Sequence, residues 1–274
     1  LKPIPTTREV VDKCMECGFC EGHCVSEGLT LSPRQRVAVF REIEHLKRTG
    51  EEPHRAAEMQ KLFRYAGEQT CATDSLCHLN CPVKADTGKL IKEIRHETHS
   101  PKGEKRAVML AGNMDKLTSL LRGGLKLLHG IRLIFGKKLF GALARGVRAI
   151  TFKLIPLWNE HMPTGASKIK RRTLPEKELK VVYFPSCITR SMGTSQSYSK
   201  EKEITRMTEA LLTAAGYQII YPENMNNLCC GMLFSSKGYV EAGKKASDEL
   251  KAALIKASEN GKYPVLCDMS PCLY

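Results

Sequence analysis

The feature that most constrains this chain is a tight run of cysteines near its start. The run has the order C-x2-C-x2-C-x3-C, which is the spacing of a bacterial-type iron–sulfur ligand run; its members are Cys14, Cys17, Cys20 and Cys24. A loop this short brings three thiolates around one face of a cluster, and a distant fourth ligand closes it. The spacing therefore predicts a fold built around iron–sulfur clusters that transfer single electrons.

A second, altered run follows, in which an aspartate stands where the first run has its second cysteine. In two-cluster proteins of this kind, the fourth cysteine of each run ligates the other cluster. We therefore predict two [4Fe–4S] clusters that exchange one ligand each. The predicted ligands of cluster I are Cys14, Cys17, Cys20 and Cys81, and those of cluster II are Cys24, Cys71, Asp74 and Cys77.

The role of Asp74 has two interpretations. As a ligand, its carboxylate offers a hard oxygen in place of a soft thiolate, which makes that iron corner more labile. As a surface residue, it would stand beside a three-cysteine site, and cluster II would then be a [3Fe–4S] cluster. We favour ligation by Asp74.

Zinc and disulfide bonds account for the cysteines less well. Structural zinc sites usually pair two C-x2-C units set well apart, which the first run does not. A chain of 274 residues can also bury a core without disulfides. The twelve cysteines therefore indicate thiolate metal sites in a reducing compartment, and the formal net charge of +14 belongs to the metal-free chain.

The first part of the chain, residues 1–100, has the hydrophobic spacing of helices and no strand pattern. Ser32 and Pro33 mark the start of one helix, and Gly50 marks its end. Two cysteine loops held between helices predict an alpha-helical ferredoxin domain. The arginines Arg34 and Arg36 lie close in sequence to the first run, where their charge can raise the reduction potential of cluster I. The alternative is that both are solvated residues of the first helical turn.

The middle part, residues 101–175, is predicted to be a basic amphipathic helical linker that its glycines break into short pieces. It has no acidic residue between Asp115 and Glu160, while basic residues border a face of leucines and isoleucines. Such a segment can lie on an anionic membrane surface. The alternative is that its apolar face packs on the rest of a larger polypeptide. Nucleic acid is rejected as a partner, because no binding motif is present and aromatic residues are few.

The last part, residues 176–274, alternates strand and helix patterns. Short β-rich runs at 180–185, 218–221 and 264–267 are separated by helical patterns at 201–215 and 240–258. This alternation predicts a small parallel sheet with crossover helices, and places the cysteines just after strand ends. The predicted fold class is therefore α+β and multidomain, with a helical ferredoxin domain followed by an α/β domain.

The cysteines of this last part resemble one repeat of the cysteine-rich CCG group. That group includes heterodisulfide reductases and the iron–sulfur subunits of glycolate- and lactate-oxidising systems. The resemblance implies a third site, holding a non-cubane iron–sulfur cluster or zinc, at Cys187, Cys229, Cys230 and Cys272. Such repeats usually occur in pairs, and Met269 stands where the closing C-x2-C commonly begins. The alternative to a third metal site is a buried cysteine pair without metal.

A narrower resemblance comes from the second cysteine run. The string of residues 70–74, followed by Cys77, Cys81-Pro82-Val83 and Asp86-Thr87-Gly88, resembles the C-terminal iron–sulfur portion of FAD-linked D-lactate dehydrogenases. This implies an electron-transfer module that receives electrons from a flavin domain, on the same longer chain or on a partner subunit. The flavin would oxidise a 2-hydroxy acid, with D-lactate preferred, and the clusters would pass the electrons to a quinone or another carrier.

This segment alone is not expected to oxidise lactate, because it has no glycine-rich nucleotide loop and no Ser/His/Asp constellation. Two alternatives remain: a heterodisulfide-reductase-like thiol/disulfide subunit, and a non-catalytic iron–sulfur sensor. The chain begins without Met and ends at Tyr274, so we expect a piece of a longer protein. Without a signal peptide or an apolar stretch of ~20 residues, we expect it in the cytoplasm. If the basic middle segment contacts a membrane, that contact is expected at the inner face of the cell membrane.

Overall fold

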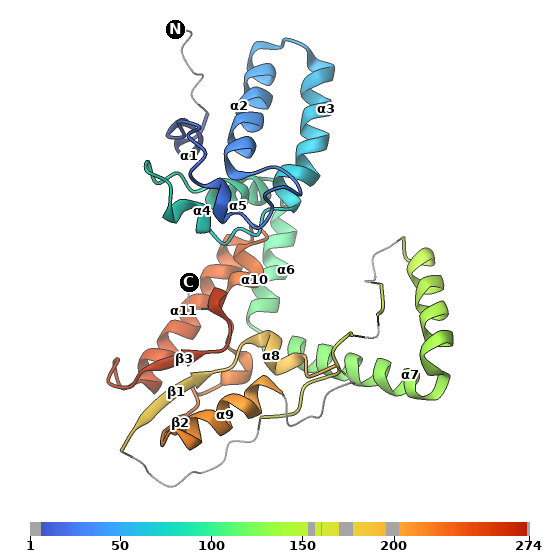
Figure 1. The fold of residues 1–274 in the computed structure, drawn as a ribbon, viewed down its shortest axis with the longest axis vertical. Coiled ribbons are helices and arrows are strands. Elements are labelled where there is room, and N and C mark those ends of the chain that lie inside the picture. The colour runs from blue at the N-terminus through green and yellow to red at the C-terminus, as the bar shows by residue number, and fades with distance from the viewer. Residues whose placement is uncertain (1–6, 153–156, 160, 170–177, 196–202, 273–274) are drawn as a thin grey trace. The chain divides into compact units, whose positions relative to one another are not determined.

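The computed structural model divides the chain into two compact units, each described here by itself (Figure 1). Unit 1 comprises Leu1–Lys105 and Leu233–Glu241, and unit 2 comprises Arg106–Met232 and Ala242–Tyr274. The structure describes all residues except 1–6, 153–156, 160, 170–177, 196–202 and 273–274. The described part is mostly helical and contains a three-stranded parallel sheet, as the sequence predicts.

Unit 1 is helical throughout its described part. Its elements are α1 (Glu9–Asp12), the 3-10 helix η1 (Glu21–His23), α2 (Pro33–Thr49), α3 (Pro53–Phe63), the π-helix η2 (Arg64–Gln69), α4 (Leu76–Leu79), α5 (Thr87–Glu97) and the start of α6 (Pro101–Ala111). The predicted signals of α2 are confirmed. Ser32 forms a capping box with Gln35, and Gly50 ends the helix with a left-handed φ of 71°.

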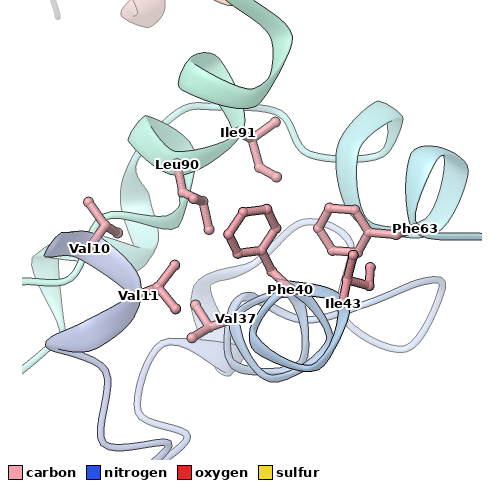
Figure 2. Close-up of a cluster of buried hydrophobic side chains, with 8 residues drawn as sticks. All are labelled: Val10, Val11, Val37, Phe40, Ile43, Phe63, Leu90 and Ile91. Carbon is pink, nitrogen blue, oxygen red and sulfur yellow. The ribbon is translucent and has the colours of Figure 1, made fainter. Parts of the chain in front are cut away.

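A single apolar cluster joins the helices on either side of the two cysteine loops (Figure 2). Its buried members come from α1, α2, α3 and α5, and are Val10, Val11, Val37, Phe40, Ile43, Phe63, Leu90 and Ile91. Helix α1 leads directly into the first loop, and α5 follows the second. Packing α1 and α5 against α2 therefore fixes where the loops begin and end. Burial of these apolar side chains stabilises the packing far more than surface contacts do.

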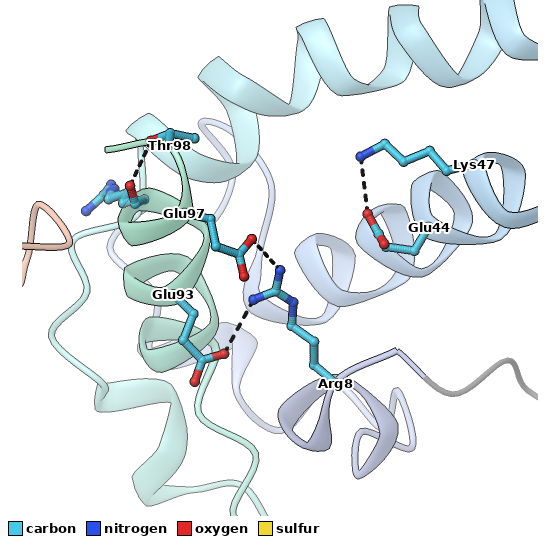
Figure 3. Close-up of polar contacts among 7 residues, drawn as sticks. Arg8, Glu44, Lys47, Glu93, Glu97 and Thr98 are labelled. Carbon is cyan, nitrogen blue, oxygen red and sulfur yellow. Dashed lines mark hydrogen bonds and ion pairs between the residues drawn. The ribbon is translucent and has the colours of Figure 1, made fainter. Parts of the chain in front are cut away.

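Arg8 links α1 to α5 at the surface of this cluster (Figure 3). Its guanidinium lies 2.7 Å from Glu97 Oε2 and 3.7 Å from Glu93 Oε2, and it stands over the Phe40 ring at 5.3 Å from the centroid. The pair of Lys47 with Glu44, also in Figure 3, lies within α2. Exposed ion pairs contribute only about 0.2–1 kcal/mol each, so they support the packing rather than determine it.

The last piece of unit 1 comes from far along the chain. Residues 233–241 dock on the end of α5, where His96 Nδ1 lies 3.0 Å from Gly238 O and His99 Nε2 lies 2.6 Å from Lys237 O. The His99 ring stacks on Tyr239 with centroids 4.0 Å apart. Gly238 has a left-handed φ of 88°, and a Cβ there would lie 2.5 Å from the backbone nitrogen of His96. This close approach requires glycine.

Unit 2 contains the parallel sheet, in the order β2-β1-β3. Its elements are the rest of α6, α7 (Met114–Ile150), β1 (Lys180–Phe184), α8 (Cys187–Ser191), α9 (Ile204–Ala214), β2 (Gln218–Ile220), η4 (Met225–Asn227), the first residue of α10 (Met232–Ser235), most of α11 (Val240–Ala257), β3 (Val265–Cys267) and η5 (Ser270–Cys272). Val181 pairs with Ile219, and Phe184 pairs with Cys267. The crossover helices α9 and α11 are those that parallel strands require, and the predicted alternation is confirmed.

The glycines of the middle segment break its helix at one place and not into several short pieces. Gly136, with φ 72° and ψ 167°, leaves the helical conformation, so the 37 residues of α7 are two helices joined across a kink. Figure 1 shows the bend in α7. The other glycines stay helical because an internal glycine costs a helix only about 1 kcal/mol, which neighbouring turns can offset. Among the helices in the described ranges, none is long and apolar enough to cross a membrane.

We predict that Gly238→Ala destabilises the protein, because the new methyl group would collide with the backbone of α5 in a strained conformation. The matched control is Gly28→Ala in the same unit, where φ is 75° but nothing lies within 4 Å of a Cβ. Urea denaturation should show the Gly238 variant losing about 1–3 kcal/mol more free energy of unfolding than the control. Equal losses would mean that residues 233–241 do not dock tightly on α5.

Candidate metal centres

The first cysteine loop is shaped to present sulfur atoms to backbone N–H groups. Glu16 and Gly18 adopt left-handed conformations, with φ of 59° and 89°. The N–H of Glu16 donates to the sulfur of Cys14, and the N–H of Arg34, in the first turn of α2, donates to that of Cys20. A helix N-terminus favours negative charge, so α2 helps to hold a thiolate at Cys20.

The second loop repeats this backbone. Thr73 and Ser75, at the positions that match the two left-handed residues of the first loop, have φ of 54° and 57°. The N–H of Thr73 donates to the sulfur of Cys71, just as its counterpart does in the first loop. Asp74 therefore occupies the position that Cys17 occupies in the first loop. The carboxylate lies between the same two turns and accepts a hydrogen bond from the N–H of Leu76 at 3.2 Å.

The four predicted ligands of cluster II line one small cavity. Its walls are formed by the loop ends and by the first turns of α2 and α5; they comprise His23, Cys24, Val25, Pro33, Arg36, Cys71, Ala72, Asp74, Ser75, Cys77, Thr87 and Gly88. The N–H groups of Thr87 and Gly88, which open α5, donate to the sulfur of Cys77. Burial raises the pKa of the Cys77 thiol, and these donors and the helix N-terminus oppose that effect.

The predicted ligands of cluster I come from the same three stretches of chain. Cys14 interacts electrostatically with Cys81 and Cys20, and the N–H of Ala85 donates to the sulfur of Cys81 at 3.2 Å. Burial raises the pKa of Cys20 to about 11. Cys17 is exposed on the loop between Cys14 and Cys20. Cys20 also interacts with Cys77, so the two sites adjoin.

Among the residues that the structure describes, no group of three or more metal-binding side chains is close enough to hold one metal ion. Thiolates are the usual ligands of iron–sulfur clusters. All twelve cysteines are free, and no disulfide competes for them. The donor set and the N–H groups aimed at sulfur fit the predicted clusters.

Arg36 is buried beside Cys24, a predicted ligand of cluster II, rather than beside the other three cysteines of the first run. Its side chain is only 1% exposed. The guanidinium donates to Gly67 O at 2.7 Å, to Thr70 Oγ1 at 3.3 Å and to the sulfur of Cys24 at 3.5 Å. Its neighbour in sequence, Arg34, is instead paired with a carboxylate at the surface, 3.1 Å from Glu21 Oε1.

A second buried guanidinium, that of Arg95, faces the same loop. It donates to the carbonyl oxygens of Cys71 (3.2 Å), Glu68 and Ser236, and burial lowers the pKa of Arg95. In the described structure neither Arg36 nor Arg95 makes a hydrogen bond to a carboxylate. Arg95 interacts electrostatically with Glu68 and Cys71, and metal-bound thiolates at Cys24 and Cys71 would add to the negative charge around both cations.

The third group of cysteines gathers at the carboxyl end of the parallel sheet. Cys187 follows β1, Cys267 ends β3, and Cys272 lies in η5, while Cys229 and Cys230 follow η4. Neighbouring thiols are hydrogen-bonded in the order Cys187, Cys229, Cys230, Cys272, Cys267. This is the edge at which α/β sheets place their sites.

Hydrogen bonds along this row separate the thiols into donors and acceptors. The bond from Cys229 lowers the pKa of Cys187 to about 7 and, with that from Cys272, lowers the pKa of Cys230 to about 3. The same bonds raise the pKa of Cys229 and Cys272 as donors. The row therefore favours thiolates at alternate positions, and thiolates are the form that binds metal.

Cys267 is a member of the row that our sequence analysis did not include among the site residues. It ends the β-rich run predicted at 264–267, and no role was predicted for it. The predicted parallel pairing of the strands could have indicated that Cys267 belongs to this site. Because β3 pairs in parallel with β1, its last residue lies at the edge where Cys187 begins α8. The structure thus adds a fifth sulfur to the four that the sequence singled out.

Gly231 explains why glycine follows the adjacent cysteines. Its φ is 84°, and a Cβ there would lie 2.3 Å from the carbonyl oxygen of Gly243 in α11. The turn can pass so close to the helix only without a side chain. Glycine at this position therefore holds the thiols of Cys229 and Cys230 against the end of the sheet.

Arg190 is the other residue that the sequence did not reveal. It is 3% exposed, and its guanidinium donates to the carbonyl oxygens of Ser186, Met225 and Leu228. It also interacts electrostatically with Cys187 and with Cys229, and burial lowers the pKa of Arg190. Within the described residues its hydrogen bonds reach no carboxylate. This third buried cation beside sulfur fits an anionic thiolate or metal–thiolate centre.

We predict that Arg36→Gln lowers the reduction potential of the cluster held by Cys24 and Cys71 by roughly 60–130 mV. A hydrogen bond to a charged group contributes about 1.5–3 kcal/mol, and a tenfold change in a one-electron equilibrium corresponds to about 59 mV. An EPR-monitored redox titration measures the shift. Lys47→Gln, which removes an exposed charge from the same helix, should leave both potentials unchanged. If Arg36→Gln and Arg36→Lys both titrate as the unsubstituted protein does, Arg36 does not act on the cluster.

Comparison with known proteins identifies the last part of the chain. Residues 181–273 match the family model of the CCG cysteine-rich domain. Searches of curated proteins and of solved structures give no match. The matched residues span the sheet, its crossover helices and the whole row of five thiols. The C-terminal part of the chain is therefore a CCG module, as the sequence predicts.

Proposed function

We propose that this chain is the electron-transfer module of an FAD-linked 2-hydroxy acid dehydrogenase, with D-lactate as the preferred substrate. It would receive electrons from a flavin domain, on the same longer chain or on a partner subunit, and pass them to a quinone or another carrier. Unit 1 would act as an alpha-helical ferredoxin domain with two clusters. A CCG domain is consistent with such an iron–sulfur module.

The observation that carries this proposal is the repeated loop of unit 1. Both loops turn their backbone through left-handed residues at matching positions and direct N–H groups at sulfur. Hydrogen bonds to sulfur and nearby charge set the potential of an iron–sulfur cluster. The two adjoining sites have different surroundings, because Arg41 and Glu16 lie near Cys14 of the first site and the buried Arg36 and Arg95 lie near Cys71 of the second. Such a difference suits directed transfer of single electrons.

The chemistry divides between the flavin and this module. Oxidation of a 2-hydroxy acid to a 2-oxo acid removes two electrons and two protons, which a flavin can accept together. Iron–sulfur clusters accept one electron at a time, and the two protons leave the flavin to water. The residues of this chain supply the ligands, the N–H donors and the buried cations. This segment alone is proposed to lack substrate turnover.

The test is the metal content of anaerobically purified protein, with EPR spectra before and after reduction. At least about eight irons with equal acid-labile sulfide, and signals from two interacting reduced clusters, would support the proposal. Zinc without sulfide would overturn it. Two clusters that cannot be reduced through a flavin domain fused to the chain, given D-lactate or another 2-hydroxy acid, would favour the sensor alternative instead.

Asp74 provides a sharper test within this proposal. We predict that Asp74→Ala loses about one iron per chain and shows an oxidised [3Fe–4S] EPR signal, because cluster II keeps three thiolates but loses its fourth ligand. Asp74→Cys should retain the full iron content. The control, His78→Ala, changes a neighbouring side chain of the same loop and should keep the original spectrum. An unchanged iron count in Asp74→Ala would show that Asp74 is not a ligand.

Thiol/disulfide chemistry at the CCG module is a second candidate function. The row of five hydrogen-bonded thiols, with the pKa of Cys187 lowered to about 7, favours it, because thiolates are the nucleophiles of disulfide exchange. In that reaction two thiols form one disulfide and release two electrons and two protons. The clusters of unit 1 would carry the electrons one at a time.

We predict that Cys229→Ser removes the metal of the CCG module while the EPR signals of the two clusters remain. The reason is that Cys229 lies in unit 2, whereas all predicted ligands of clusters I and II lie in unit 1. Iron and zinc analysis beside EPR measures both. Loss of a cluster signal would contradict the assignment of ligands to separate units. Full metal content with loss of disulfide reduction would favour the thiol/disulfide function.

A further inference from the structure

The first half of α7 carries two exposed rows of apolar side chains. Residues seven apart lie on nearly the same side of a helix. Leu120, Leu127 and Ile134 form one such row, and Leu121, Leu128 and Phe135 form the row beside it. Their exposure is large, reaching 75% for Leu120 and 80% for Ile134. Together they make a continuous apolar strip on one side of the helix.

This strip is distinct from the side on which α7 packs. Met114, Thr118 and Leu125 are buried, and α7 contacts α8 and η4 within unit 2. At 100° per residue, these three positions lie about a quarter-turn beyond the exposed strip. The packing of unit 2 therefore fixes the helix with its apolar strip facing outwards.

The second half of α7, after the break at Gly136, has the same organisation. Leu139, Leu143, Val147 and Ile150 recur at helical spacing and are all exposed. At the edge of this row, beside Val147, Phe140 is buried and packs edge-on against Trp158, with centroids 5.2 Å apart. The exposed side chains of these rows, here called the α7 apolar surface, are Leu120, Leu121, Leu127, Leu128, Ile134, Phe135, Leu139, Leu143, Val147 and Ile150. Leu133, which is 69% exposed, lies away from them on the helix.

The charge around this surface has one sign. Within α7, its basic residues are Lys116, Arg122, Lys126, Arg132, Lys137, Lys138, Arg145 and Arg148, and Asp115 is its only acidic residue. In the second half, the four basic residues lie across the helix from the apolar row. The excess of basic residues beside an apolar row matches a surface that is anionic and also takes up apolar side chains. It does not match a protein surface of mixed charge.

We propose that the α7 apolar surface binds the face of an anionic lipid bilayer. The helix would lie in the plane of the interface, with its apolar side chains between the acyl chains and its lysines and arginines at the headgroups. The bend at Gly136 separates two amphipathic halves that can each lie flat. The proposal rests on α7 alone and is independent of the electron-transfer function.

The experiment is flotation of the full 274-residue chain with vesicles of phosphatidylcholine, with and without phosphatidylglycerol. We expect binding to the anionic vesicles that weakens with salt, and little binding to the neutral ones. Each lysine near an anionic surface contributes about a fivefold gain, so Lys137→Gln with Lys138→Gln should weaken binding roughly 25-fold. Leu139→Gln with Leu143→Gln should weaken it about tenfold or more.

The matched control is Ala142→Gln with Ala149→Gln, which introduces the same side chains into the same helix away from the apolar row. It should bind as the unsubstituted protein does, and unchanged helix content and visible absorbance show that each variant is folded. Equal binding to neutral and anionic vesicles, no binding to either, or a loss as large in the control would overturn the proposal. Self-association that disappears in the Leu139/Leu143 variant, without vesicle binding, would assign the surface to a second copy.

Discussion

Positive charge buried beside sulfur is the constraint on which both halves of this structure depend. Arg36, Arg95 and Arg190 are each almost fully buried. Arg95 and Arg190 donate to backbone carbonyls, whereas Arg36 donates to one carbonyl, one hydroxyl and the sulfur of Cys24. A guanidinium keeps its charge at any physiological pH, so the fold must supply an anion. Cysteine thiolates would supply negative charge in all three places, together with Glu68 near Arg95 and with Asp115 and Asp268 near Arg190. The guanidinium groups thus both hydrogen-bond to the loops and favour ionised cysteines.

The two loops of unit 1 show how one backbone can serve two ligand sets. The left-handed turns and the N–H donors repeat, while the fourth residue changes from Cys17 to Asp74. The backbone sets the shape of the loop, so the exchange leaves the Cβ of the fourth residue in the same place. The loop therefore tolerates either side chain. Differences between the sites then arise from their surroundings. The first has Glu21 paired with Arg34, and the second has buried arginines.

Local chemistry made much of this structure predictable. Ser32 and Gly50 bounded their helix correctly, and the three strands were found, because caps and β-rich runs depend on neighbours in sequence. The helical character of α7 was visible, but its length was not, since packing decides whether a glycine ends a helix. The burial of Arg36 and the arrival of Cys267 at the site depend on residues far away in sequence, and no local pattern reports them.

Residues 233–241 belong to unit 1, although they lie in the sequence of the CCG module. The chain leaves unit 2 two residues after Gly231, completes unit 1 against α5, and returns within α11. Unit 1 is therefore unfinished while the ribosome is still making the CCG module. Its cysteine loops must await the segment from Leu233 to Glu241 before Arg95 gains its last partner, Ser236. Maturation of the two metal-binding parts is consequently tied to one late event in synthesis, and a cut near residue 105 would free neither part as an intact domain.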